Sequence, residues 1–421
     1  MNKQILSMAA LAGIFLFTAC SDDEKVPAMG GSDSTVSEIK ISLDSGGEEV
    51  TTRAGRPVNS SAAANAVDKV QLKVYKSNGS AWEEDMGAEI VGAEAQGILS
   101  WSGPTGEGTP GSTVRNQSKT VKLKNLTAGS YRIVAYGYQT DHGYANPTFD
   151  ATSGVFTTPQ ITYATGDNGT NVEELFAGSA DFAADANGKI TSTEVEVTML
   201  RQVAGLLGYF KNIPVLKANA DGAVKAVRYV KVKTVSQTKQ FTFPSTQPYN
   251  GTAADAEGEY VLLTYDLSAL LGETAYNQQV TEAGEDLTKV FTIAAQVTTP
   301  ATVANSILAG RYIVPFAAAI SQNTLQVDLE DADENVLRSW DIRITNASTG
   351  TTPTDTEALQ YNIQRNKFYS IGRKLKSDST NGGTTDSDTD DDKPVDLNND
   401  NDIIVILNDA WDVIYDMSLG D

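Results

Sequence analysis

Cysteine and histidine are nearly absent from this chain. Its 421 residues contain one cysteine, Cys20, and one histidine, His142. A single cysteine excludes a disulfide within the chain, and zinc sites built from cysteine and histidine lack ligands. A Ser-His-Asp triad could use only His142, which lies in a turn-like segment and is expected to be an exposed loop residue. We therefore expect a structural protein with no catalytic residues, no metal ion and no cofactor.

Basic residues and long helical repeats are scarce as well. There are 32 Lys and Arg against 54 Asp and Glu, which gives a net charge of -22. Phosphate binding needs a positive surface, so the charge argues against nucleic acid and against docking of the mature domain on an anionic membrane. Short alternating strands separated by Gly-rich turns indicate an all-β protein made of sandwiches, and the length suggests two of them.

The N-terminal residues have the pattern of a targeting segment. Lys3 precedes an apolar run, residues 5–17, that is too short for a membrane-spanning helix. The run ends in Phe17-Thr18-Ala19-Cys20 and polar residues follow. Small residues before a cysteine resemble a bacterial lipobox, so we expect residues 1–20 to be a lipoprotein signal peptide and Cys20 to be lipidated. The alternative is an ordinary signal peptide with an incidental cysteine.

A short strand and an exposed loop follow. Ile39, Ile41 and Leu43 alternate with polar residues, which predicts one strand with a buried face inside a pro-segment, residues 21–53. The following stretch is rich in Gly, Ser, Thr and Asn, which is typical of a loop that proteases reach. Within it we expect cleavage between Arg53 and Ala54, because Pro57 disfavours a cut after the neighbouring arginine.

The rest of the chain divides by composition. We expect an N-terminal β-sandwich domain at 54–190 and a C-terminal one at 191–375, with the boundary accurate to about 15 residues. Residues 376–402 are acidic and of low complexity, which predicts a flexible linker. Residues 403–421 are apolar again and predict terminal strands, whose last part alternates polar side chains with Trp411, Val413, Tyr415 and Met417.

Three other patterns favour no specific chemistry. The string Gly106-Glu107-Gly108-Thr109-Pro110-Gly111 matches a dinucleotide motif, but its surroundings predict a loop rather than a strand and a helix. The acidic linker lacks the glycine and glutamate of an EF-hand, so it is interpreted as a solvated charge run, with a weak calcium site left open. A paired-carboxylate glycosidase leaves no local signature and stays a remote alternative.

Several features occur together and in a fixed order. They are the lipobox at Cys20, the pro-segment strand, Arg53 within 51–55, the strand 67–75, the segments 195–204 and 364–371, and the strand with Trp411. In this combination the chain resembles the fimbrillins of Bacteroidia-type anaerobes, the lipoprotein precursors of protease-matured (type V) pili. The resemblance implies two tandem transthyretin-like Greek-key β-sandwich domains, and export as a precursor lipid-anchored at the outer membrane. It also implies cleavage by an Arg-specific surface protease, and a mature protein in cell-surface fimbriae.

The resemblance also implies polymerisation with other fimbrial subunits by strand exchange, in support of adhesion to host or bacterial receptors. A sandwich that lacks one strand exposes an apolar groove, which another strand can fill. The pro-segment strand would fill it in the precursor, and the strand with Trp411, Val413, Tyr415 and Met417 would fill it in the next subunit. The main alternative is a monomeric surface-anchored adhesin or carbohydrate-binding lipoprotein. The sequence leaves open whether the chain is a stalk, tip or anchor subunit.

Overall fold

The structure of the chain is a computed structural model that describes a large part of it. The chain divides into two units, residues 1–34 and 35–421, and all described residues belong to the second unit. The described residues are 36–44, 67–94, 97–101, 116–138, 147–158, 174–234, 240–245, 260–296, 301–316, 325–346, 363–372, 392–399 and 403–408.

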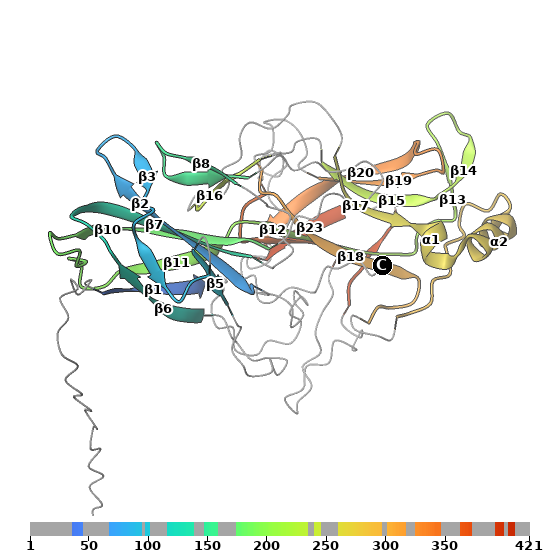
Figure 1. Ribbon diagram of the computed structural model, residues 1–421. Coiled ribbons are helices and arrows are strands. Elements are labelled where there is room, and N and C mark those ends of the chain that lie inside the picture. The colour runs from blue at the N-terminus through green and yellow to red at the C-terminus, as the bar shows by residue number, and fades with distance from the viewer. Residues whose placement is uncertain are drawn as a thin grey trace, which may run out of the picture. The chain divides into compact units, whose positions relative to one another are not determined.

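The first half of the chain forms a sheet that bends around one core (Figure 1). Its strand order is β3-β2-β7-β10-β11-β1-β6-β4, and β5 also pairs with β2. The core takes side chains from β2, β7 and β10 and also from β1, β6 and β11, so the two stretches of the sheet face each other as a sandwich. The strands are β1 (Ser37–Asp44), β2 (Lys69–Ser77), β3 (Trp82–Glu84), β4 (Glu89–Val91), β5 (Ile98–Ser100), β6 (Asn116–Lys124), β7 (Gly129–Tyr138), β10 (Phe176–Ala184) and β11 (Glu196–Arg201).

The second half forms a sheet of similar size in the order β17-β15-β19-β20-β23-β21-β12-β18, with β22 also paired to β12. Side chains join its two end strands: Arg311 Nη1 donates to the Leu262 carbonyl at 3.0 Å. Tyr265 Oη donates to the Gly208 carbonyl of β12 at 2.7 Å. The strands are β12 (Ala204–Lys211), β15 (Tyr229–Thr234), β17 (Tyr260–Asp266), β18 (Ser306–Ile313), β19 (Gln326–Glu330), β20 (Val336–Asn346), β21 (Phe368–Ile371), β22 (Val395–Asp396) and β23 (Ile403–Asn408).

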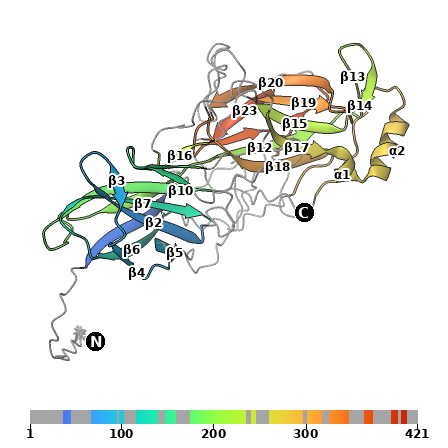
Figure 2. The same ribbon diagram turned by 45° about the horizontal axis from the view of Figure 1, so that its top comes forward.

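Smaller elements complete the described part of the chain (Figure 2). Asp266 caps the short helix α1 by accepting from the backbone amides of Ser268 and Ala269. A three-stranded sheet, β16-β9-β8, joins strands from both halves of the sequence. It packs on an aromatic cluster that includes Tyr136 and Phe243, whose ring centroids are 5.4 Å apart. The elements are β8 (Thr148–Asp150), β9 (Val155–Thr157), β13 (Leu216–Ala218), β14 (Val224–Ala226), β16 (Thr242–Phe243), α1 (Leu267–Leu271) and α2 (Glu273–Ala283).

The expectation of an all-β protein is confirmed, since strands dominate the described residues and the helices are short. The chain passes from the first sheet to the second between β11 and β12, at Gln202 and Val203. This point lies a little beyond the expected domain boundary near 190. No helix among the described residues has the length and apolar character needed to cross a membrane.

The expected linker at 376–402 is partly held against the second sheet. Its residues 392–399 contain β22, which pairs in parallel with β12. Tyr209 Oη donates to the Asp392 carboxylate at 2.8 Å, and Asn212 Nδ2 donates to the Asp396 carboxylate at 2.7 Å. The Leu397 side chain is buried. This end of the acidic stretch is therefore fixed by contacts with β12 rather than being a free linker.

Candidate functional site: the position of strand β1

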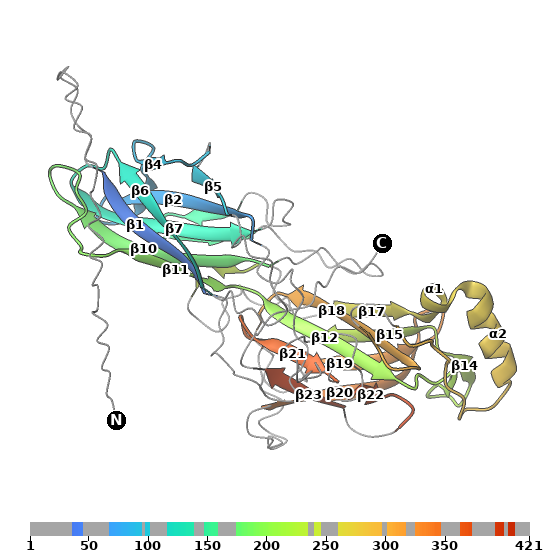
Figure 3. The same cartoon turned by 90° about the horizontal axis from the view of Figure 1, so that it is seen from below.

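β1 occupies an inner position of the first sheet, between β6 and β11 (Figure 3). It pairs antiparallel with β6 along its whole length, beginning with Ser37 opposite Leu123. Its pairing with β11 is parallel and begins with Lys40 opposite Glu196. A strand that precedes the rest of the domain in sequence thus lies between two strands that follow much later. In the sheet it fills a gap that would otherwise leave two unpaired strand edges.

The inner face of β1 belongs to the core. Ile39, Ile41 and Leu43, which the sequence assigned to a buried face, are each at most 1% exposed. Burying such side chains contributes about 1.5–3 kcal/mol each as an upper estimate, so the three together contribute on the order of 5–9 kcal/mol. They lie in one cluster with side chains of both neighbouring strands, among them Val121, Leu123, Val197 and Met199.

The second sheet holds a strand with the same kind of surroundings. β23 lies between β20, to which it is parallel, and β21, to which it is antiparallel. The first part of the expected terminal arm is therefore a strand of its own second sheet. Trp411, Val413, Tyr415 and Met417 lie outside the described residues, so the donor role expected of them stays a prediction.

The two motifs near the domain change contact each other. Arg201 is the last residue of β11, just before the change of sheet, and its side chain is fully buried. Its Nε donates to the Glu174 carboxylate at 2.7 Å, and its Nη1 donates to Asn366 Oδ1 at 3.0 Å. Asn366 has a positive φ of 54°, which asparagine tolerates, and its backbone N–H donates to the Val203 carbonyl. Segments 195–204 and 364–371 thus form one hydrogen-bonded junction.

A buried ionic cluster on the second sheet was not expected from the sequence. Lys231 and Lys233 on β15 are at most 4% exposed, and they pair with Glu330 and Asp328 on β19 at 2.7 and 2.9 Å. Burial lowers the pKa of Lys231, but hydrogen bonds to Glu330 and Glu334 outweigh it, and the pKa lies above its ordinary value. The alternation of valine and lysine in β15 was visible, but it also fits an exposed outer face.

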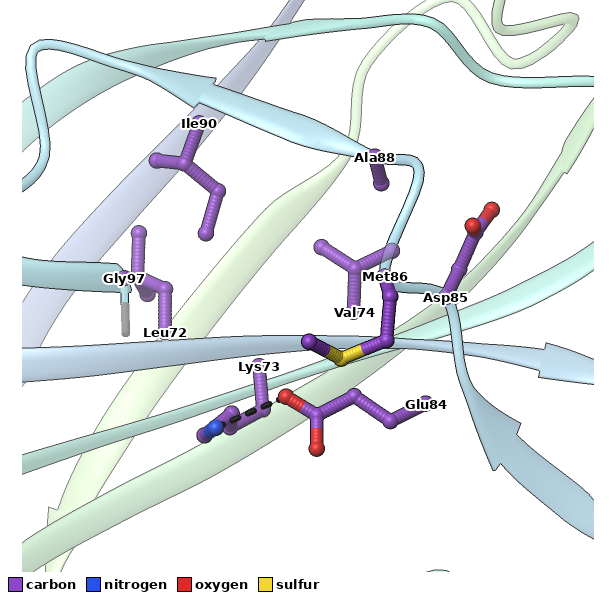
Figure 4. A pocket seen from close by; sticks show the side chains of 9 residues that line it. All are labelled: Leu72, Lys73, Val74, Glu84, Asp85, Met86, Ala88, Ile90 and Gly97. Carbon is purple, nitrogen blue, oxygen red and sulfur yellow. Dashed lines mark hydrogen bonds and ion pairs between the residues drawn. The ribbon is translucent and has the colours of Figure 1, made fainter. Parts of the chain in front are cut away.

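A hollow lies beside β2 (Figure 4). It has a volume of about 180 Å³. β5 pairs with β2 before it and β3 pairs with β2 after it, so the hollow lies where the two partners of β2 leave a gap. Its one cation, Lys73, is paired with Glu84 at 2.7 Å, and Met86 at its rim is 84% exposed. These side chains assemble neither a nucleophile with a base nor a metal site.

The remaining sequence predictions fall on residues that the structure does not describe. Cys20, Arg53, Ala54 and His142 all lie outside the described ranges. Among the residues that are described, no group of three or more His, Cys, Asp or Glu side chains could hold a metal ion. The candidate functional site is therefore the position of β1 between β6 and β11, because a segment with a predicted function lies there among described residues.

Solved structures that are similar to the chain include fimbrial proteins from Porphyromonas gingivalis and Parabacteroides distasonis. The fimbrial anchor protein Mfa2 from Porphyromonas gingivalis is 9% identical, with 80% of this chain and 90% of that chain covered and a TM-score of 0.36. The tip fimbrial protein Mfa3 from the same organism, in a C-terminally truncated form, is 12% identical, with coverages of 79% and 94% and a TM-score of 0.30. A fimbrial assembly protein from Parabacteroides distasonis is 10% identical, with coverages of 82% and 95% and a TM-score of 0.30.

Comparison with protein-family models assigns the chain to a family. No curated protein matches the chain at a significant level. The model of the family described as fimbrillin-A associated anchor proteins Mfa1 and Mfa2 matches residues 38–386. The match begins inside β1 and includes the rest of the first sheet, the second sheet as far as β21, and the two segments that meet at Arg201. The chain therefore belongs to the family of fimbrillin-A associated anchor proteins.

Proposed function

We propose that this protein is a structural subunit of cell-surface fimbriae that assembles by exchange of strands with other fimbrial subunits. The observation that carries the proposal is the position of β1, an inner strand joined to the rest of its domain only through residues 45–66. Arg53 lies in that segment. Cleavage there by an Arg-specific surface protease would leave β1 held by noncovalent contacts alone. The precursor would be anchored at the outer membrane by a lipid on Cys20.

The energetics of β1 favour exchange over simple loss. Its removal would uncover the apolar core face and leave the facing backbone groups of β6 and β11 without strand partners, which is costly unless another strand enters. A strand from a neighbouring subunit would restore both kinds of contact. Because the donor of one copy would meet the groove of the next, the contact is heterologous, and its repetition gives a filament.

Limited cleavage with trypsin followed by electron microscopy tests this proposal. The full chain should form filaments after cleavage, while Arg53→Ala protein should remain monomeric. The matched substitution Arg56→Ala should leave filament formation intact, because Arg56 precedes a proline. N-terminal sequencing of the cleaved protein should begin at Ala54. Filaments from uncut protein, or no filaments from protein cut cleanly at Arg53, would argue against strand exchange.

The family description favours a second possibility for the place of this subunit in a fimbria. An anchor subunit would keep its lipid and its own β1, and would contact other subunits without losing the pro-segment. The seating of β23 in its own second sheet fits such a subunit, because β23 is already used within the chain. Surface protein that begins at Cys20 would support the anchor role, whereas surface protein that begins at Ala54 would support the polymerising role.

A further inference from the structure

The outer face of β1 carries alternating charges that face opposite charges. Glu38 lies across from Lys122 of β6, with 3.6 Å between Glu38 Oε1 and Lys122 Nζ. Lys40 lies beside Glu196 of β11, with 3.0 Å between Lys40 Nζ and Glu196 Oε1. We call these four residues the charge ladder. Each neighbour of β1 thus provides one charge to a different residue of the strand.

The apolar face of β1 alone does not fix its register completely. A slip by one residue would turn Ile39, Ile41 and Leu43 outward, which the core forbids. A slip by two residues keeps the alternation, so apolar side chains still point inward. The core then loses only one end residue of the apolar set, and a serine takes its place: Ser37 in one direction and Ser45 in the other.

The charge ladder penalises both of these two-residue slips. In one direction Glu38 moves to the place of Lys40 and faces Glu196. In the other direction Lys40 moves to the place of Glu38 and faces Lys122. Like charges directly opposite each other in a sheet are destabilising, whereas opposite charges stabilise a pair. In the observed register both pairs are attractive.

We propose that the charge ladder sets the register of the strand seated between β6 and β11, and so selects which strand can occupy this position. An occupant must bring apolar side chains to the places of Ile39, Ile41 and Leu43. Its residue opposite Lys122 should be acidic. Its residue opposite Glu196 must not be acidic.

The C-terminal arm of a second copy meets these requirements in one register. This step rests on the proposed strand exchange and on an arm that runs in the direction of β1. With Val413, Tyr415 and Met417 in the places of Ile39, Ile41 and Leu43, Asp412 comes opposite Lys122 and Ile414 comes opposite Glu196. Moving the arm by two residues brings Asp412 opposite Glu196 in one direction and Asp416 opposite Glu196 in the other. The charge ladder therefore favours only one register of the arm between β6 and β11.

Disulfide trapping in the full chain tests the register of β1 itself. In a Cys20→Ser background, Ser42→Cys is combined separately with Ser118→Cys, which lies opposite in the observed register, and with two slip reporters. Asn116→Cys and Thr120→Cys report the two slips by two residues. All three pairs lie on the same type of antiparallel position, so their rates of disulfide formation are comparable. With the native ladder, the pair at 42 and 118 should form fastest.

Reversal of the charges on β1 then distinguishes the effect of the charge ladder on the register from the effect of the apolar core. Glu38→Lys with Lys40→Glu should raise the ratio of slip disulfides to the native disulfide roughly tenfold, since two attractions become two repulsions. Adding Lys122→Glu and Glu196→Lys should restore the native ratio. The proposal is overturned if the reversed strand keeps the native ratio, or if reversal of its neighbours does not restore it.

A matched control uses an ion pair elsewhere in the same sheet. Lys73 and Glu84 are 2.7 Å apart on β2 and β3, away from β1. Reversing both, with Lys73→Glu and Glu84→Lys, should leave the disulfide ratios at β1 unchanged. Thermal unfolding provides a second measurement. The protein with reversed charges on β1 alone should melt at a lower temperature than the protein in which all four charges of the charge ladder are reversed. Equal melting temperatures would contradict a specific pairing.

The arm is tested between molecules after cleavage with trypsin. Ser118→Cys is combined with Ile414→Cys, Asp416→Cys or Ser418→Cys, each in the Cys20→Ser background. The proposed placement puts position 416 opposite 118, so only that pair should give intermolecular disulfides. Disulfides from position 414 or 418 would overturn the placement. Absence of all three intermolecular disulfides would refute donation by the arm. The test of the register of β1 does not depend on this outcome, because it uses disulfides within the uncut chain.

Discussion

At the scale of single residues, the buried pair of Arg201 and Glu174 differs in kind from the ion pairs at the surface. Arg201 is fully buried and Glu174 is 4% exposed, and the guanidinium also lies over the Phe176 ring, with 4.8 Å from its carbon to the centroid. Its hydrogen bond to Asn366 ties the end of β11 to the turn before β21. Removal of one charge from such a pair leaves the other in a poorly solvated place.

The substitution Glu174→Gln should therefore lower the free energy of unfolding by about 3–5 kcal/mol, because it removes the carboxylate of a buried ion pair. Glu38→Gln is the matched control. It breaks a pair whose carboxylate side chain is 62% exposed, and it should cost at most about 1 kcal/mol. Urea unfolding of the two variants beside the parent measures both values. Similar losses in the two variants would contradict the assigned role of burial.

Stability should also depend on pH through Glu196. Hydrogen bonds from Lys40 and then Ser42 hold the pKa of the Glu196 carboxyl below its usual value of 4.5. A lowered pKa in the folded state means that the contribution is present above the unfolded pKa and is lost as pH falls through the folded pKa. Between pH 7 and about pH 3 the parent should lose more stability than Glu196→Gln. Equal losses in urea unfolding would rule out this contribution.

At the scale of elements, the burial of β1 should contribute strongly to the free energy of unfolding of the first domain. Ile41 lies at the middle of its inner face and is fully buried. Ile41→Ala should lower the free energy of unfolding of the uncut protein by about 2–5 kcal/mol through lost burial and a residual cavity. The neighbouring outward residue gives the control, since Ser42→Ala removes only exposed hydrogen bonds and should change this free energy by about 1 kcal/mol or less. A small effect of Ile41→Ala would show that β1 contributes little to the domain.

The alternation of Ile39, Ile41 and Leu43 was enough to predict β1 as a strand with one buried face, because a period of two is a local property. Its partners were not predictable in the same way. The register of β1 on β11 joins residues 40 and 196, and nothing local in the sequence specifies such a pairing. The same reason explains β22: its composition predicted a free linker, but distant residues of β12, such as Tyr209, hold it.

Arg201 and Asn366 illustrate the limit for side chains. Their two segments were singled out in the sequence as separate family features, and only the fold shows that they contact each other. The buried Lys231 and Lys233 were hidden for a related reason. A lysine that alternates with valine fits an exposed face until the facing carboxylates on β19 are known.

At the scale of the whole molecule, the two sheets each contain an inner strand from near one end of the chain. β1 is parallel to β11 and antiparallel to β6, and β23 is parallel to β20 and antiparallel to β21. β1 is joined to the next strand of its domain through residues 45–68, a long connection of the kind that strand exchange requires, whereas β23 follows β22 of its own sheet after residues 397–402. In the proposed assembly only β1 is replaced, β23 stays in its sheet, and the residues after β23 enter the next subunit.

Removal of residues 409–421 tests this account most directly, because it deletes the proposed donor and keeps β23. After cleavage with trypsin, the full chain and the truncated chain are compared by electron microscopy, with thermal unfolding as a check on folding. The account predicts that the truncated protein melts at the same temperature as the full chain before cleavage and forms no filaments after it. Filaments of normal length from the truncated protein would contradict the central claim that the C-terminal arm replaces β1.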